Sequence, residues 1–209
     1  QDFLLADSQR GLRFMLEYEK AEQALRAWGV HSTVVVFGSA RVHENGNAQH
    51  ARWYNEARKF GKICSLEGGA LERNGSGRDN VIATGGGPGI MEAANRGAFE
   101  TGDLSIGLNI SLPREQTPNH YITPALCFRF HYFALRKMHF LLRARAIVVY
   151  PGGFGSFDEI FEVLTLIQTK KMKPLPVILV GTEHWKSIVR FDLLVEQGLI
   201  DASDMDILT

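Results

Sequence analysis

Short apolar runs alternate with longer amphipathic segments along most of the chain. The run at 33–37 is Thr-Val-Val-Val-Phe, and apolar residues recur at helical spacing over 48–66. Apolar β-branched runs favour buried strands, whereas a period of about 3.6 residues favours helices that bury one side. The strands predicted in this way are 33–37, 80–84, 104–110, 126–130, 147–150 and 176–180. The predicted helices are 8–28, 48–66, 90–100, 133–143, 160–170 and 184–197.

The alternation of strands with helices predicts the fold class α/β. Parallel strands joined by right-handed helical crossovers form a doubly wound, mostly parallel, Rossmann-like sheet with helices on both faces. A chain of 209 residues is long enough for one such domain with its own core. We therefore expect a single domain over 1–209, with an extra helix at about 8–28. The glycine-rich segment 68–79 is expected to be a flexible surface insertion, because strand patterning resumes directly after it.

Charge and cysteine content narrow the class of protein. The 23 basic and 23 acidic residues cancel, which argues against a general nucleic-acid or membrane-surface binder. Apolar runs fall short of the roughly 18 residues that a membrane-spanning helix needs. Cys64 and Cys127 form no CxxC pair, and no Cys/His cluster indicates a metal. We expect a cytoplasmic protein in a reducing compartment, without metal, cofactor, nucleic acid or membrane partner.

Three turns rich in small residues directly follow predicted strands. They occupy 38–40, 85–89 and 152–156. Ligands of parallel α/β sheets bind at the carboxyl ends of the strands, near the point where the strand order reverses. We therefore expect the three turns to form one site.

The stretch 150–159, Tyr-Pro-Gly-Gly-Phe-Gly-Ser-Phe-Asp-Glu, is typical of an anion cradle. Its glycines let backbone N–H groups converge at a helix start, where the helix dipole favours negative charge, and Ser156 adds a hydroxyl donor. Glu159 is expected in the first turn of the following helix. A carboxylate there is either a stabiliser of the helix start or a chemical group.

The turn 85–89 is a second candidate cradle. Four of its five residues are glycine, which costs chain entropy wherever it is not needed, so phosphate contact is favoured over an empty tight turn. It is not a dinucleotide fingerprint, because the third glycine is out of register and Asp103 precedes the next strand instead of ending it. Two cradles without a triphosphate motif indicate a ligand with one phosphate.

A basic pair, Arg136-Lys137, lies within the aromatic-rich stretch 128–140. Solvated helix charges are the ordinary interpretation of such a pair. The aromatic residues predict burial, however, and a buried arginine needs a carboxylate or phosphate partner. His131 and His139 are expected to be core or interface residues.

These motifs together resemble those of the LOG family. The family consists of cytokinin-activating phosphoribohydrolases that have long been labelled lysine-decarboxylase-like. The resemblance is carried by 85–94, Gly-Gly-Gly-Pro-Gly-Ile-Met-Glu-Ala-Ala, by Arg136-Lys137 and by 151–159. It covers about 33–200, and the early helix and 68–79 resemble a longer branch of the family. The family pattern P-G-G-x-G-T-x-x-E has Ser156 here in place of Thr, which keeps the hydroxyl.

The resemblance implies hydrolysis of the N-glycosidic bond of a nucleoside 5′-monophosphate, AMP or an N6-substituted AMP, to free base and ribose 5-phosphate. Glu159 would stabilise the oxocarbenium-like ribosyl centre and take a proton from water. Arg136 would orient either Glu159 or the ribose, and would hold Glu159 ionised. The substrate-binding candidates are Gly85, Gly86, Gly87, Glu115, Asn119, Lys137, Gly152, Gly153, Gly155 and Ser156. The family also implies a homodimer, or a higher homo-oligomer, formed through 128–140.

Two other classes of protein remain open. The same fold and glycine loops occur in molybdenum-cofactor carrier proteins, which bind a phosphorylated pterin without turnover. A nucleotide-sensing module would use Glu159 only as a structural residue. A pyridoxal-phosphate decarboxylase is disfavoured, because it needs a Schiff-base lysine and Lys137 is the only lysine near a motif.

Overall fold

One parallel sheet forms the centre of the molecule. The computed structural model describes residues 2–71, 75, 77–111 and 117–208. The strands within these ranges are β1 Thr33–Phe37, β2 Val81–Thr84, β3 Ser105–Ile110, β4 Cys127–Phe130, β5 Ala144–Val149 and β6 Val177–Leu179. They pair in the order β4-β3-β2-β1-β5-β6, and every neighbouring pair is parallel. The predicted doubly wound α/β class is confirmed.

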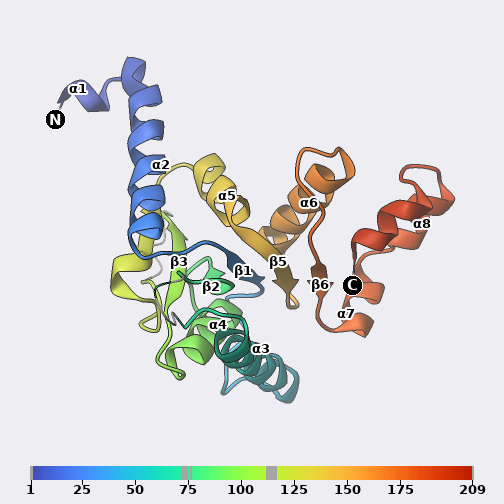
Figure 1. Cartoon of the computed structure of the whole chain (residues 1–209). Helices are drawn as coiled ribbons and strands as arrows, with labels where there is room; N and C mark the ends of the chain where they lie inside the picture. Colours follow the sequence, from blue (N-terminus) through green and yellow to red (C-terminus); the bar gives the residue numbers. More distant parts are fainter. Residues whose placement is uncertain (1, 72–74, 76, 112–116, 209) are drawn as a thin grey trace.

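Helices cover both faces of the sheet. The α-helices are α1 Asp2–Leu5, α2 Arg10–Ala27, α3 Ala48–Glu67, α4 Ile90–Phe99, α5 Phe133–Leu142, α6 Phe154–Gln168, α7 Thr182–Ile188 and α8 Phe191–Glu196. Short 3-10 helices are η1 Asp7–Gln9, η2 Pro124–Leu126 and η3 Ala202–Ile207. Figure 1 shows α3 and α4 on one face of the sheet, and α2, α5 and α6 on the other. Within the described ranges, each helix is too short or too polar to traverse a lipid bilayer.

The central strand β1 is apolar over its last four positions, Val34 to Phe37, because both faces of the strand are covered. Val34 and Val36 belong to the core beneath α3 and α4, whereas Val35 and Phe37 belong to the core on the opposite face. Successive side chains of a strand point to opposite faces, so a strand covered on both sides needs apolar residues at every position.

Close packing of α3 against α4 depends on two glycines. A Cβ on Gly61 would collide with the carbonyl oxygen of Ala94, and a Cβ on Gly97 would collide with that of Arg58. The two backbones therefore touch, and larger residues at either position would force the helices apart.

Three predicted boundaries were wrong. The helix expected from 160 begins at Phe154, with Gly153 as its extended N-cap, so Glu159 lies in the second helical turn and not in the first. The strand expected from 147 begins at Ala144. The last helix, expected over 184–197, is divided into α7 and α8, because Val189 adopts extended backbone angles. Residues 72–74 and 76 of the predicted insertion, and 112–116 of the loop after β3, lie outside the described residues.

The strand order reverses at β1. The chain moves from β1 through β2 and β3 to β4, and then returns to place β5 on the other side of β1. All strands are parallel, so the carboxyl ends of β1, β2 and β5 lie at the same edge of the sheet. This edge is where a doubly wound sheet binds its ligand.

Candidate active site

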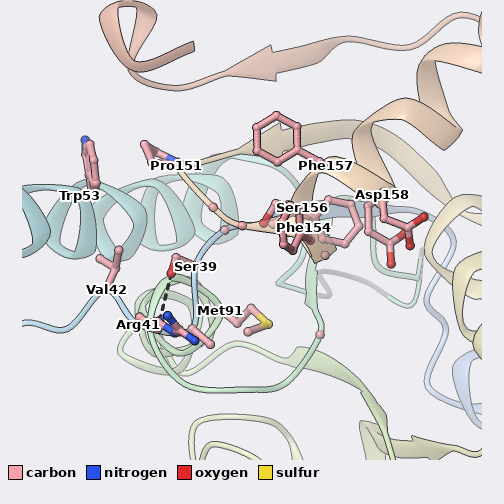
Figure 2. A pocket seen from close by; sticks show the side chains of 18 of the residues that line it. Ser39, Arg41, Val42, Trp53, Met91, Pro151, Phe154, Ser156, Phe157 and Asp158 are labelled. Atoms are coloured by element: carbon pink, nitrogen blue, oxygen red, sulfur yellow. Dashed lines mark hydrogen bonds between the residues drawn. The ribbon is translucent and has the colours of Figure 1, made fainter. Parts of the chain in front are cut away.

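A cleft of about 740 Å³ opens at this edge (Figure 2). Its walls come from the turn after β1, from Gly85 after β2, and from the loop and first helical turns after β5. Side chains from α3, α5 and α7 complete it. The turns 38–40 and 152–156 therefore line one cavity together with Gly85, whereas 86–89 do not line it. That these turns bind one ligand stays a prediction.

The loop between β5 and α6 is held to the turn after β1. The N–H of Ser39 donates to the carbonyl of Pro151 at 3.1 Å. A Cβ on Gly152 would collide with the side chain of Ser156, whose hydroxyl folds back over this position. Glycine is therefore required at Gly152 by the shape of the loop itself.

Gly153 and Gly155 have a different role. A Cβ on either residue would meet nothing within 4 Å, so the protein does not need glycine there for its own packing. Both line the cleft, together with Phe154 and Ser156. The first N–H groups of α6 have no acceptor within the helix, and the positive end of the helix dipole lies at the same terminus. Small residues here keep those donors open to an anion in the cleft.

A buried amide network supports the turn after β2 from behind. The Nδ2 of Asn119 donates to the carbonyls of Gly86 and Gly87 at 3.2 and 3.0 Å, and to the Oδ1 of Asn95 at 3.0 Å. The N–H of Gly86 donates to Thr84 Oγ1 at 2.9 Å. Asn119, Gly86 and Gly87 are not among the residues that line the cleft.

Gly85 makes room for an arginine. A Cβ at this position would lie 2.6 Å from Nη2 of Arg136. The Nε of Arg136 donates to the carbonyl of Leu108 at 2.7 Å, and its guanidinium lies 4.9 Å from the centre of the Phe140 ring. Nη1 of Arg136 is 3.7 Å from Oε1 of Glu159, which is an ion pair beyond hydrogen-bond distance. The carbonyl of Leu108 and the ring of Phe140 thus fix the position of Arg136, and its guanidinium charge faces the cleft.

Glu159 is the buried carboxyl of the site. Its side chain is 9% exposed. Burial raises its pKa from 4.5 to about 7, while the charges of Arg136 and Lys137 act in the opposite direction. Arg136 lowers this pKa, which is the direction expected of a residue that holds Glu159 ionised, but the desolvation of the carboxylate outweighs the attraction. At neutral pH the carboxyl is divided between its two forms, which suits a group that gives and takes protons.

Lys137 lies outside the cleft. Its Nζ is 2.7 Å from Oδ2 of Asp158 and 3.1 Å from Oε2 of Glu162, on the outer side of α6. Glu115 lies outside the described residues. The residues predicted for the site that the structure brings together at the cleft are Arg136, Glu159, Gly85, Gly152, Gly153, Gly155 and Ser156.

Several cleft residues were missed by the sequence analysis. They are Arg41, His50, Trp53, Met91 and His184. Arg41 directly follows the small-residue turn after β1, and that position was a usable signal. Trp53 lies within the helical apolar pattern over 48–66, which by itself predicts only an amphipathic helix, and no local pattern marks His184.

The fold and the cleft define a class of protein, a doubly wound α/β protein with a glycine-lined cleft at its switch point. The match of residues 91–209 to the family model described as "Possible lysine decarboxylase" defines the family. Because this match spans more than half of the chain, the protein belongs to that family, which is also the LOG family that the motifs resemble.

Two relatives from Arabidopsis thaliana agree with this assignment. The chain is 26% identical over 168 residues to cytokinin riboside 5′-monophosphate phosphoribohydrolase LOG4 of Arabidopsis thaliana. The aligned region covers 72% of this chain and 76% of the relative. LOG1 of the same plant is 27% identical over 160 residues, covering 68% and 73%.

Two solved structures share the fold. A structural genomics target named TM1055 has a TM-score of 0.58 at 23% identity, over 85% of this chain and 89% of the target. A molybdenum cofactor binding protein from the phototrophic bacterium Rippkaea orientalis has a TM-score of 0.50 at 19% identity, over 81% and 84%.

Proposed function

We propose that the protein is a phosphoribohydrolase that cleaves the N-glycosidic bond of a nucleoside 5′-monophosphate, AMP or an N6-substituted AMP. The observation that carries the proposal is Glu159, a buried carboxyl with a pKa of about 7 that lines the cleft beside a glycine loop. The names of the Arabidopsis relatives support the same reaction.

The first turn of α6 is the proposed phosphate site. A 5′-phosphate there would accept hydrogen bonds from the N–H groups of Phe154 and Gly155 and from the hydroxyl of Ser156. Glu159 follows one helical turn later, which would set its carboxyl beside the ribose. The phosphate would thus hold the sugar in place for the reaction.

Glu159 is the proposed catalytic group. When the C1′–N bond breaks, its electron pair leaves with the base and positive charge develops on the ribosyl ring. The carboxylate form of Glu159 would stabilise that charge and then take a proton from the water that attacks C1′. The departing base takes a proton from solvent, which balances the reaction. Arg136 is a proposed positioning residue, because its charge opposes the burial that neutralises Glu159.

Decarboxylation with pyridoxal phosphate does not fit this site. The cofactor is held as a Schiff base on a lysine. Among the described residues that line the cleft there is no lysine, and Lys137 is paired with Asp158 and Glu162 on the outside of α6.

The test is release of free base from AMP and from an N6-substituted AMP, followed by chromatography. We expect turnover by the wild type, and a loss of at least about a hundredfold in Glu159→Gln with AMP binding retained. Glu162→Gln, one turn further along α6 and outside the cleft, is the matched control. Binding of AMP without any release of base by the wild type would refute hydrolysis. A phosphorylated pterin would then be the next ligand to test, because the alternative is a carrier protein that binds such a pterin without turnover.

We also propose that the protein assembles as a homodimer through α5 and the start of α6. Phe133 and Met138 on α5 are 53% and 44% exposed, and Phe154 is 95% exposed. Large apolar side chains with this much exposure are typical of protein interfaces. Light scattering of Phe133→Ser should show a shift toward monomer, and an unchanged mass would exclude this surface.

A further inference from the structure

The cleft continues past the proposed phosphate site, away from Glu159. In Figure 2, Asp158 and Trp53 lie at opposite ends of the view, with Ser156, Ser39 and Arg41 between them. A nucleoside monophosphate bound with its ribose at Glu159 and its phosphate at the start of α6 fills only one end. The other end is lined by groups that the proposed reaction does not use.

Arg41 is the first of these groups. It is exposed within the cleft, and among the described residues its guanidinium has no ion pair or side-chain hydrogen bond. Arg136, in contrast, is engaged by Leu108 and Glu159. Arginine presents a planar set of N–H donors that matches phosphate oxygens. An uncompensated guanidinium in a cleft that already offers helix N–H groups is a site for further negative charge.

Trp53 forms the far end, between two imidazole rings. Its ring stacks against His50 at 6.0 Å between centroids and meets His184 edge-on at 5.6 Å. All three side chains line the cleft and come from α3 and α7. The Nε2 of His184 is buried and has no partner among the described residues. This end therefore offers a flat aromatic surface with an unused polar atom beside it.

We propose that the cleft takes nucleotides that carry a second phosphate and a planar group beyond the 5′-phosphate, that is, pyrophosphate-linked dinucleotides. Arg41 binds the second phosphate, and Trp53 with its two histidines stacks on the terminal ring. The proposal rests on the proposed function, because that function puts the first phosphate at α6 and the scissile bond at Glu159.

The order of the groups along the cleft sets the ligand class. Helix N–H groups, a guanidinium and an aromatic surface follow one another from α6 toward α3, as the two phosphates and, beyond the second ribose, the terminal base do in a pyrophosphate-linked dinucleotide. A charge-assisted arginine–phosphate contact gives about a tenfold to hundredfold gain in affinity. Stacking of a base on an aromatic side chain gives about fivefold or more.

The experiment measures dissociation constants by calorimetry for AMP, ADP and diadenosine diphosphate. Glu159→Gln serves as the background, so that turnover does not consume the ligand. We expect ADP to bind at least about tenfold more tightly than AMP, and the dinucleotide about fivefold more tightly again. Arg41→Gln should remove the advantage of ADP and leave AMP unchanged. Trp53→Ala should remove only the advantage of the dinucleotide.

Two controls keep the result interpretable. Arg52→Gln removes an exposed charge that pairs with Glu56 outside the cleft, and it should change none of the three constants. Trp53→Phe keeps a ring, so it should retain part of the dinucleotide advantage even where Trp53→Ala folds poorly. Equal binding of AMP and ADP would overturn the proposal. So would an Arg41→Gln variant that loses AMP as much as ADP, since Arg41 would then serve a single phosphate.

The outcome is separable from that of the proposed function. If the wild type releases base from AMP but ADP gains nothing through Arg41, the hydrolase proposal stands and the extended site fails. If no base is released but ADP gains affinity through Arg41, the extended site stands on a binding protein.

Discussion

Substitution of Glu159 by glutamine is expected to stabilise the protein above neutral pH. The carboxyl is buried among α5, α6 and the sheet, and burial raises its pKa from 4.5 to about 7. Below pH 4.5 it is protonated in both the folded and the unfolded chain, so it causes no pH-dependent cost. As the pH rises from 4.5 to 7, the unfolded chain ionises first and is favoured. Above pH 7 the full cost of the buried charge is present.

The size of the effect follows from the two pKa values. A change from 4.5 to about 7 corresponds to about 3 kcal/mol of unfolding free energy above neutral pH. Most of this develops between pH 5 and pH 8. For a chain of this length, 1 kcal/mol shifts Tm by about 2–4 °C, so the variant should gain about 5–10 °C over the wild type in that interval.

The assay is thermal unfolding of both proteins at intervals from about pH 5 to pH 8. The quantity compared is the change with pH in the difference between the two Tm values, because a constant offset includes the altered contact with Arg136. Glu196→Gln on α8 is the matched control for the loss of an exposed glutamate. A Tm difference that stays constant with pH would refute the reasoning, since Glu159 would then ionise equally in both states and burial would not outweigh Arg136.

Two further predictions follow from the same contacts. The kcat/KM for base release should rise about tenfold per pH unit below pH 7 and level off above it. The reason is that the carboxylate form of Glu159 is the active one and its pKa is about 7. A rate that falls across this range would show that the protonated form is required. Gly61→Ala should lower the unfolding free energy by about 1–3 kcal/mol in urea, because its methyl group meets the backbone of α4 at Ala94. The loss should be absent in Gly11→Ala, since Gly11 is a helical glycine of α2 whose added Cβ would meet no described atom within 4 Å.

Much of the fold was predictable because its signals are local. The apolar run of β1 and the amphipathic pattern of α3 each specify an element from neighbouring residues alone. Boundaries were less predictable where glycine is involved. The residues 154–156 were assigned to a loop for their glycine content, yet they form the first turn of α6 with Gly153 as its cap.

Residues of the candidate site were predictable where a glycine-rich turn follows a strand. They were not predictable where residues far apart in the sequence come together in space. The glycine loop after β5 and Arg136 line the cleft, and their roles in binding remain predictions. Asn119 was assigned to substrate binding, but its amide supports the turn after β2 from behind. Trp53 and His184 carry no shared motif, because they are brought together only when α7 packs beside α3.

The sequence alone determined the kind of sheet, the edge at which three small-residue turns meet, and the presence of a carboxyl after a glycine loop. These are properties of backbone preference and hydrophobic spacing, which act over a few residues. Tertiary structure alone decided the charge of Glu159, because desolvation depends on everything packed around the carboxyl. It also decided that Gly85 leaves room for Arg136, and that Arg41 has no counter-charge among the described residues of a cleft that Trp53 also lines.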